Sequence, residues 1–176
     1  TGIVTKLDTL EKQAKIVYLG IGSNLGYRFQ NIEKAKSYLC QSGINLISKS
    51  SYYETPSWPD PKNPKFINIV IKVKCLIGVY DLLDLCKLIE LKLGRKKGPK
   101  NSPRQCDIDI IDFNGKILNY LNIDLTVPHP RMDKRNFVLL PLFEINKTWI
   151  HPKNKKNIVN LISNLKGDDI RSIKYI

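Results

Sequence analysis

Histidine and cysteine are scarce in this 176-residue sequence, and their positions do not suit a zinc site. The two histidines, His129 and His151, stand outside any Cys/His cluster, and no two cysteines have the spacing of metal ligands. Each cysteine lies in an apolar periodic segment, which favours buried free thiols over disulfides. We therefore expect a cytoplasmic protein. The four cysteines are Cys40, Cys75, Cys86 and Cys106.

Long hydrophobic runs are missing as well. No apolar stretch approaches the ~20 residues that a membrane span needs, and the first fifteen residues lack the apolar core and cleavage site of a signal peptide. We expect no membrane partner. Residues 1–14 are polar and aperiodic, which predicts an N-terminal tail or linker, whereas residues 15–176 suit one domain. Because the first residue is Thr1, we expect a trimmed chain or a piece of a longer polypeptide.

Acidic side chains are few. There are 16 Asp and Glu residues against 29 Lys and Arg, which gives a formal net charge of +13. Such a charge indicates an anionic partner, which could be nucleic acid, acidic lipid or a polyphosphate. The alternative is that lysine is simply abundant on solvated faces, and composition leaves both open.

Apolar periodicity predicts the order strand, helix, strand, strand, helix, strand. The strands are expected at 16–21, 44–53, 66–75 and 104–111, and the helices at 27–41 and 79–93. This order is that of a ferredoxin-like βαββαβ unit, an α+β fold with helices packed on a mainly antiparallel sheet.

Two further predictions concern the turns after the first and the last of these strands. The glycines after the first strand do not form a dinucleotide-binding fingerprint, because Leu25 stands where a third glycine is required. Ser23 or Asn24 is instead expected to cap the next helix. Asn114 and Gly115 indicate a hairpin, with 116–118 as the returning strand.

The rest of the chain is expected to be a C-terminal elaboration. It contains a helical stretch at 134–144, interrupted at Pro141, and a short apolar helix near 158–165. Because this part also carries a basic run at 153–156, we predict that the region after 144 is a solvated cap.

A pair of carboxylates stands out in the last predicted strand. Side chains two residues apart on a strand point to the same face, so Asp107 and Asp109 project side by side while Cys106, Ile108 and Ile110 face a core. Neighbouring carboxylates repel each other unless a cation lies between them. That cation could be Lys, Arg or a hard ion such as Mg²⁺. The alternative is a solvated or ion-paired sheet face.

The segment before this strand supplies cations. Residues 95–104 are rich in Arg, Lys, Gly and Pro, which predicts a flexible cationic loop. The carboxylates could hold metal ions, and the cations of the loop could hold the phosphates that those ions bridge.

The segment 55–64 and the strand after it could hold a flat ligand. The segment has four prolines, which exclude regular structure and lower the entropy lost when a loop closes. Trp58 is either part of a buried loop or a surface indole. Phe66 and Asn68 share one strand face, which suits a heterocycle with polar edges, whereas Ile67 to Cys75 in alternation form the core face. The alternative is an edge-strand aromatic that covers its neighbours.

Five motifs in this order resemble the 6-hydroxymethyl-7,8-dihydropterin pyrophosphokinase family of the folate pathway. They are Gly22–Gly26; Ser51–Pro56 followed by Phe66–Asn68; Ile89–Arg95; Pro103–Asp109; and Val127–Met132 followed by Arg135 and Phe137.

The resemblance implies an enzyme that transfers the β,γ-diphosphate of ATP to the hydroxymethyl oxygen of the pterin and releases AMP. It assigns two Mg²⁺ ions to Asp107 and Asp109. The implied catalytic residues are Arg95, Lys97, Arg104, Asp107 and Asp109. The implied ATP-binding residues are Glu90, Arg95, Arg104, Ile110, Thr126, His129 and Arg135. The implied pterin-binding residues are Thr55, Pro56, Trp58, Phe66, Asn68 and Phe137. Fusion to, or association with, neighbouring folate-pathway enzymes is a further expectation from the family.

The chain departs from the family pattern at three places. The loop has Asn101 and Ser102 where some members carry a Trp, Lys87 stands where Gln is common, and Trp58 replaces an aliphatic residue. None of these departures removes a metal ligand that the resemblance implies.

Two other functions remain as alternatives. An RNA-recognition domain has a similar fold but needs paired aromatics on its central strands, where this chain has only Tyr18 and Phe66. Adjacent aspartates would also repel phosphates, so we expect no nucleic-acid partner. An inactive scaffold is disfavoured by the presence of both aspartates, His129 and the basic loop.

Overall fold

The computed structural model of the chain describes residues 13–58, 60–96, 98–99 and 101–176. Two sequence-based predictions lie outside these residues, namely most of the N-terminal tail and the catalytic role of Lys97.

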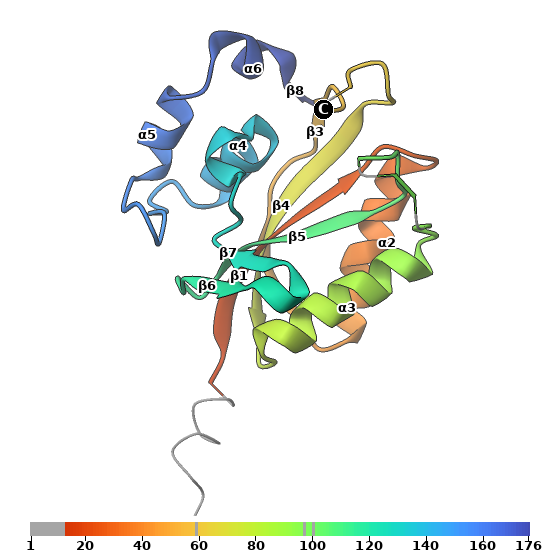
Figure 1. The fold of residues 1–176 in the computed structure, drawn as a ribbon, viewed down its shortest axis with the longest axis vertical. Helices are drawn as coiled ribbons and strands as arrows, with labels where there is room; N and C mark the ends of the chain where they lie inside the picture. The colour runs from red at the N-terminus through yellow and green to blue at the C-terminus, as the bar shows by residue number, and fades with distance from the viewer. Residues whose placement is uncertain (1–12, 59, 97, 100) are drawn as a thin grey trace, which may run out of the picture.

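The centre of the fold is an antiparallel sheet (Figure 1). Strand β1 (Lys15–Ser23) lies between β4 (Phe66–Cys75) and β5 (Asp107–Phe113), and it is antiparallel to both. The short strands β2 (Asn45–Lys49) and β3 (Tyr53–Thr55) both pair with β4, and β8 (Lys174–Tyr175) pairs with β3. The predicted antiparallel sheet with packed helices is confirmed.

The predicted strand at 44–53 is wrong in its extent, because the structure divides it into β2 and β3. Ser50 lies at the break. Its hydroxyl accepts a hydrogen bond from Val70 N (3.0 Å) and donates to Ser51 O (2.8 Å), while its own N–H donates to Val70 O (2.9 Å). The Ser50 hydroxyl thus replaces a backbone carbonyl as the acceptor of the Val70 N–H, as serine hydroxyls often do.

Helices α2 (Arg28–Gln41) and α3 (Val79–Lys92) cover one face of the sheet. This face buries the alternate apolar residues of β1, β4 and β5 against the two helices. The glycines that follow the helices, Gly43 and Gly94, have φ of 83° and 95°, the left-handed conformation that ends many helices. The predicted capping by Ser23 or Asn24 is wrong, since the residue before α2 is Tyr27 and no side chain caps the helix.

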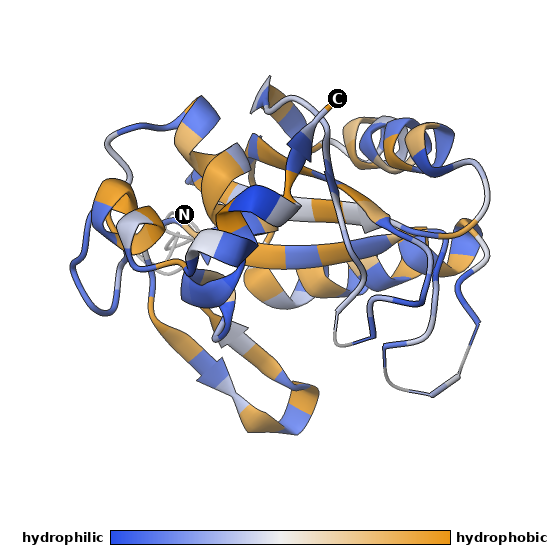
Figure 2. Cartoon of the chain, turned by 90° about the horizontal axis from the view of Figure 1, so that it is seen from above, coloured by the Kyte–Doolittle hydropathy of each residue, from blue (hydrophilic) through white to orange (hydrophobic). Residues whose placement is uncertain are grey.

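The C-terminal region forms a second core on the opposite face, so the predicted solvated cap is wrong. It comprises α4 (Asn136–Ile145), α5 (Ile158–Ser163) and α6 (Gly167–Ser172), preceded by the hairpin of β6 (Leu118–Tyr120) and β7 (Leu125–Val127) and by short 3₁₀ turns at Leu121–Ile123 and Met132–Lys134. Figure 2 shows apolar residues on the strands and on the helices that pack against them. The second core contains Tyr18, Val70, Ile111, Met132, Val138, Leu139, Leu142, Trp149, Ile158, Leu161 and Leu165.

Buried polar groups tie this second core to the sheet. The Trp149 indole N–H donates to Asp112 Oδ2 (2.8 Å), and the Asn146 amide donates to the Tyr18 hydroxyl (2.7 Å). Helix α4 also continues through Pro141, where an interruption was predicted. Burial of Pro141 and Leu142 against the sheet offsets the hydrogen bond that a proline cannot make.

The hairpin prediction at Asn114 and Gly115 is partly wrong. The turn is present, with φ of 54° and 68°, but the returning strand β6 pairs with β7 and not with β5. Asn114 instead exchanges hydrogen bonds with Ile16 in β1. In the part of the chain that the structure describes, no helix is both long and apolar enough to cross a membrane.

Candidate active site

The site is organised by Gly22, which lies in β1 between two polar residues of its neighbouring strands. Gly22 pairs with Asn68 of β4 on one side and with Asp107 of β5 on the other. Residues paired across neighbouring strands project from the same face of a sheet, so Asn68 and Asp107 lie on one face. The strands β4 and β5, which flank β1, are about 10 Å apart. The missing side chain leaves room between Asn68 and Asp107. Gly20 pairs in the same way with Asp109.

The predicted orientation of the aspartates agrees with the structure. Ile108 and Ile110 lie in the core under the helices, whereas Ile111 lies in the second core on the other face. Asp107 and Asp109 therefore share the face of Gly22 and Asn68. Because the Ile110 side chain is buried in the helix-side core, a nucleotide contact at this position would have to use its backbone.

Three arginines from different segments neutralise the two carboxylates. Arg95 Nη1 lies 3.0 Å from Asp107 Oδ1, and Arg104 Nη1 lies 3.4 Å from the same oxygen. Arg135 Nη1 lies 3.0 Å from Asp109 Oδ2. The Arg104 Nε is buried and has no hydrogen-bond partner within the described ranges. That N–H therefore has no protein acceptor among these residues.

The two carboxylates also affect each other. Burial and the negative charge of Asp109 raise the pKa of Asp107, while Arg104 and Arg95 counteract the rise. A cation bound next to both carboxylates would favour the charged form of Asp107.

His129 lies beside Asp109 as a neutral imidazole. Burial and the nearby charges of Arg135 and Arg131 lower the pKa of His129 to about 4. Its Nδ1 accepts the Arg131 N–H (3.2 Å), and its Nε2 lies 3.4 Å from Arg135 Nη1 and 3.8 Å from Asp109 Oδ2. The uncharged His129 ring thus lies between Arg135 and Asp109.

Glu90 holds other parts of the site in place. Its Oε1 accepts the Ile108 N–H (2.7 Å) at the start of β5, and its Oε2 lies 2.5 Å from Arg95 Nη1. Burial and repulsion from Asp107 raise the pKa of Glu90 to about 7. In this arrangement Glu90 positions both the Asp107 strand and Arg95.

Three of the residues predicted to bind the pterin come together. Asn68 Nδ2 donates to Thr55 Oγ1 (3.1 Å), and Thr55 pairs with Phe66 across β3 and β4. Thr55 and Asn68 are both buried. An amide has two donor hydrogens and an acceptor oxygen, so Asn68 keeps capacity for a ligand.

The remaining residues predicted to bind the pterin or ATP do not take part in the contact between Asn68 and Thr55. Phe137 at the start of α4 lies under the Arg135 guanidinium, 5.4 Å from ring to Cζ. Trp58 is 63% exposed, with its ring 5.9 Å from Arg131 Cζ. Pro56 follows Thr55 directly, and Thr126 Oγ1 donates to Asn119 Oδ1 (3.2 Å) in the β6–β7 hairpin.

Sequence reasoning missed the role of Asn24, which joins three segments. Its N–H donates to Arg104 O (3.1 Å), its Oδ1 accepts the Arg104 N–H (2.8 Å), and its Nδ2 donates to Pro64 O (3.1 Å). Asn24 is 1% exposed. It thereby connects the segment before β4 to the segment before β5, that is, the Asn68 side of the site to the Asp107 side.

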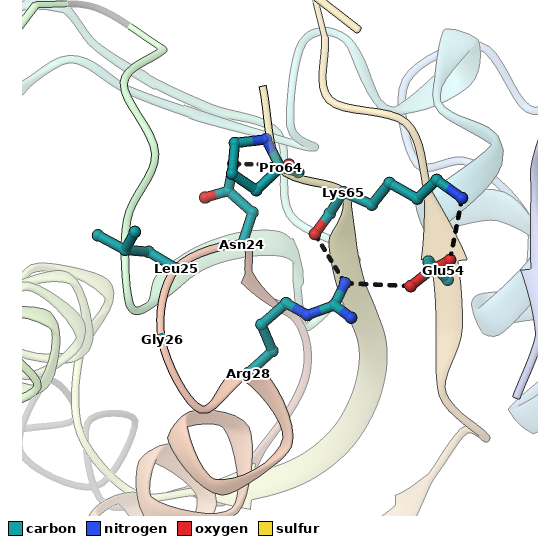
Figure 3. Close-up of a pocket in the computed structure, with 7 residues that line it drawn as sticks. All are labelled: Asn24, Leu25, Gly26, Arg28, Glu54, Pro64 and Lys65. Atoms are coloured by element: carbon teal, nitrogen blue, oxygen red, sulfur yellow. Dashed lines mark hydrogen bonds and ion pairs between the residues drawn. The ribbon is translucent and has the colours of Figure 1, made fainter. Parts of the chain in front are cut away.

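A pocket of about 470 Å³ lies next to Asn24 (Figure 3). In the figure the Asn24 side chain points toward Pro64, and Arg28 reaches both Glu54 and the Lys65 carbonyl. The lining of this pocket does not include Asp107 or Asp109. Glu54, which lines it, pairs with Ile67, whose side chain lies in the core under the helices, on the other face of the sheet from the aspartates.

Asn24→Ala tests the connection. We expect the free energy of unfolding to fall by about 2 kcal/mol, because two buried hydrogen bonds are lost. Amide hydrogen exchange should become faster at Arg104 in particular, since its N–H loses its acceptor. Asn31→Ala is the matched control, because the Asn31 side-chain amide donates to Ser23 and Leu25, which are close to it in the sequence. Equal effects of the two variants on exchange at Arg104 would contradict the connection.

Comparison with known proteins identifies relatives. Residues 18–147 match the family model of 7,8-dihydro-6-hydroxymethylpterin-pyrophosphokinase (HPPK). The 2-amino-4-hydroxy-6-hydroxymethyldihydropteridine pyrophosphokinase of Aquifex aeolicus is 37% identical over 140 residues, which cover 80% of this chain and 86% of that protein. The folic acid synthesis protein FOL1 of Dictyostelium discoideum is 42% identical over 137 residues, which cover 78% of this chain but only 20% of that protein.

Solved structures agree in fold. The wild-type Plasmodium falciparum HPPK-DHPS with pterin and p-hydroxybenzoate superposes with a TM-score of 0.70 at 17% identity, over 94% of this chain and 47% of that chain. This chain spans about a fifth of the length of several of its relatives, among them the Pneumocystis carinii and Dictyostelium folic acid synthesis proteins. Since the family model covers most of the chain and the Aquifex relative is matched over most of its length, the chain belongs to the HPPK family.

Proposed function

We propose that the chain transfers diphosphate from ATP to the hydroxymethyl group of 6-hydroxymethyl-7,8-dihydropterin in folate biosynthesis and releases AMP. The observation that carries the proposal is the pairing of Gly22 with Asn68 on one side and Asp107 on the other. A site for a flat polar heterocycle and a site for charged phosphates are thereby neighbours on one sheet face. Membership of the HPPK family supports the same reaction.

The donor set fits Mg²⁺. Asp107 and Asp109 offer carboxylate oxygens on a shared face. Among the described residues, no group of three or more His, Cys, Asp or Glu side chains could hold a metal ion, so a bound ion would need ligands from water or substrate. Mg²⁺ usually takes one or two carboxylates and completes its shell with water and substrate phosphates. We propose that these two residues hold two ions, which when bound would neutralise the phosphates and polarise the transferred group.

The arginines would bind the phosphate chain. Arg95, Arg104 and Arg135 reach the carboxylates from three segments, and the free Nε–H of Arg104 can donate to a phosphate oxygen. His129, which lies beside Arg135 and Asp109, would add a neutral polar contact. We assign Lys97 to the same group on the resemblance alone, and Glu90, Ile110 and Thr126 to the surroundings of the nucleotide.

The pterin would lie over Gly22 between aromatic rings. Phe66 and Phe137 are the proposed stacking residues, each such contact being worth about 1–3 kcal/mol in nucleic-acid systems. Asn68 with Thr55 would bind the polar edge, together with the backbone at Pro56. Trp58 would cover the ligand from the loop.

In the reaction the hydroxymethyl oxygen forms a bond to the β-phosphorus, and the bond from that phosphorus to the α,β-bridging oxygen breaks. AMP leaves with the bonding electron pair, and the hydroxyl proton passes to a phosphate oxygen and leaves with the products. No strong base is needed if positioning and charge neutralisation supply the rate. Closure of the segments 55–64 and 95–103 would exclude water and suppress hydrolysis.

Two architectural assignments accompany the function. We propose that β1, α2, β2/β3, β4, α3 and β5 form a ferredoxin-like unit within one domain of residues 15–176, since their order and pairing match that plan. We also propose fusion to, or association with, another folate-synthesis enzyme, because relatives include the folate synthesis bifunctional protein of Pisum sativum. The cytoplasmic location expected from the free thiols stays a prediction.

A coupled assay tests the function directly. With ATP, Mg²⁺ and 6-hydroxymethyl-7,8-dihydropterin, we expect equal amounts of AMP and pterin diphosphate. Removal of the metal with EDTA should abolish both products, and an excess of Mg²⁺ should restore them. Absence of AMP under these conditions, or AMP formed without consumption of the pterin, would disprove the proposal.

A further inference from the structure

A buried hydroxyl on the loop after β3 lacks a partner. Ser57 is 4% exposed, and its Oγ makes no hydrogen bond within the part of the chain that the structure describes. Buried hydroxyls in proteins are nearly always hydrogen-bonded, because an unpaired one loses its bonds to water. By contrast, the Ser50 hydroxyl has protein partners on both sides.

The position of Ser57 links the two sides of the site. Two residues before it, Thr55 Oγ1 accepts the Asn68 amide. Directly after it, the Trp58 ring lies against Arg131, whose N–H donates to His129 Nδ1. Ser57 therefore lies where the loop passes from the Asn68 side toward the His129 segment, and it is buried there although Trp58 is largely exposed.

We propose that Ser57 Oγ is a binding and specificity residue for the heterocycle, with a hydrogen bond to the polar edge that Asn68 also contacts. This inference rests on the proposed function and extends it, because Ser57 is not among the residues that the resemblance assigns. A hydroxyl can both donate and accept, so it suits an edge on which ring nitrogens and a carbonyl alternate with an amino group. The Pro56–Ser57 stretch then contributes a side chain as well as its backbone.

The experiment measures the Kd of 6-hydroxymethyl-7,8-dihydropterin in the presence of Mg²⁺ and a non-hydrolysable ATP analogue. For Ser57→Ala we expect about 3- to 10-fold weaker binding of the pterin, the loss of one neutral hydrogen bond. The Kd of the nucleotide analogue should not change. The melting temperature without ligands should be unchanged or higher, since the variant removes an unpaired buried hydroxyl. Ser57→Thr keeps the hydroxyl and should bind more tightly than Ser57→Ala.

The matched control is Ser50→Ala. Because the Ser50 hydroxyl bonds to the backbone of Val70 in β4 and of Ser51 before β3, its loss should lower the melting temperature without a selective effect on the pterin. A set of pterins lacking either the amino or the carbonyl group completes the test. The effect of Ser57→Ala should disappear for the analogue that lacks the partner of Ser57, as in a double-mutant cycle.

Three results would overturn the inference. The first is unchanged pterin binding in Ser57→Ala, which would indicate that the hydroxyl binds only water. The second is an equal loss of pterin and nucleotide binding, which would indicate a general structural role. Both leave the proposed function intact, because the wild type still binds the pterin. The third is a wild type that does not bind the pterin at all, in which case the proposed function fails as well. If Ser57→Ala did not fold, Ser57→Gly would serve in the same measurements.

Discussion

Asp109→Ala should reduce AMP formation by at least about 10³-fold while the protein remains folded. The variant removes a carboxylate proposed to hold Mg²⁺, and stabilisation of transition-state charge by a metal is worth several kcal/mol. Stability should change little, because the lost pairing with Arg135 is offset by relief of the repulsion from Asp107. The measurements are a coupled AMP assay and thermal unfolding.

The control for this variant is Asp84→Ala on the exposed side of α3, which should leave turnover and stability unchanged. A second readout is binding of a non-hydrolysable ATP analogue with and without Mg²⁺. The wild type should bind the analogue more tightly with the metal, and Asp109→Ala should lose most of that difference. Normal turnover of Asp109→Ala, or an undiminished effect of Mg²⁺ on its binding, would contradict the metal assignment.

Gly22→Ala should weaken pterin binding by about 10- to 100-fold. A Cβ at this position would lie 2.7 Å from Asn68 Oδ1 and 3.4 Å from the Phe66 ring. The methyl group would therefore displace the amide that is proposed to bind the polar edge of the heterocycle, and such hydrogen bonds are worth about 1.5–3 kcal/mol together. The Kd of the pterin, measured with the ATP analogue present, checks this prediction.

Gly20→Ala is the matched control, two residues away on the same face of β1. Its Cβ would meet only the flexible end of the Ile111 side chain, at 3.3 Å. We expect a small loss of stability from crowding in the second core and an unchanged Kd for the pterin. Equal weakening by both substitutions would show that the effect arises from the strand and not from Asn68.

The features that sequence reasoning predicted correctly depend on local pattern. Alternation along β5 places Asp107 and Asp109 on one face and Ile108 and Ile110 in the core, as the structure has them. Periodicity also predicts α2 and α3, each followed by a glycine with positive φ. These features follow from the repeat of a strand or helix, which short stretches of sequence reveal.

The features that were missed depend on contacts between distant residues. The Asn24 side chain bonds to Pro64 and Arg104, which are 40 and 80 residues away, so its own neighbourhood indicated only a turn or a cap. The second core was missed because Trp149, Ile158 and Leu161 are separated by Lys and Asn residues that suggest solvent exposure. In the same way, the division of β2 from β3 results from the bond between Ser50 and Val70 across the sheet.

The short strand β8 has a consequence for self-association. It pairs through Tyr175 with Tyr53, and the Ile176 N–H donates to Tyr52 O (3.0 Å), so the outer edge of β3 is occupied. An open edge offers unpaired backbone groups to other chains, whereas a covered edge does not. Residues 174–176 thus cover the sheet edge at residues 52–54 and block intermolecular strand addition there.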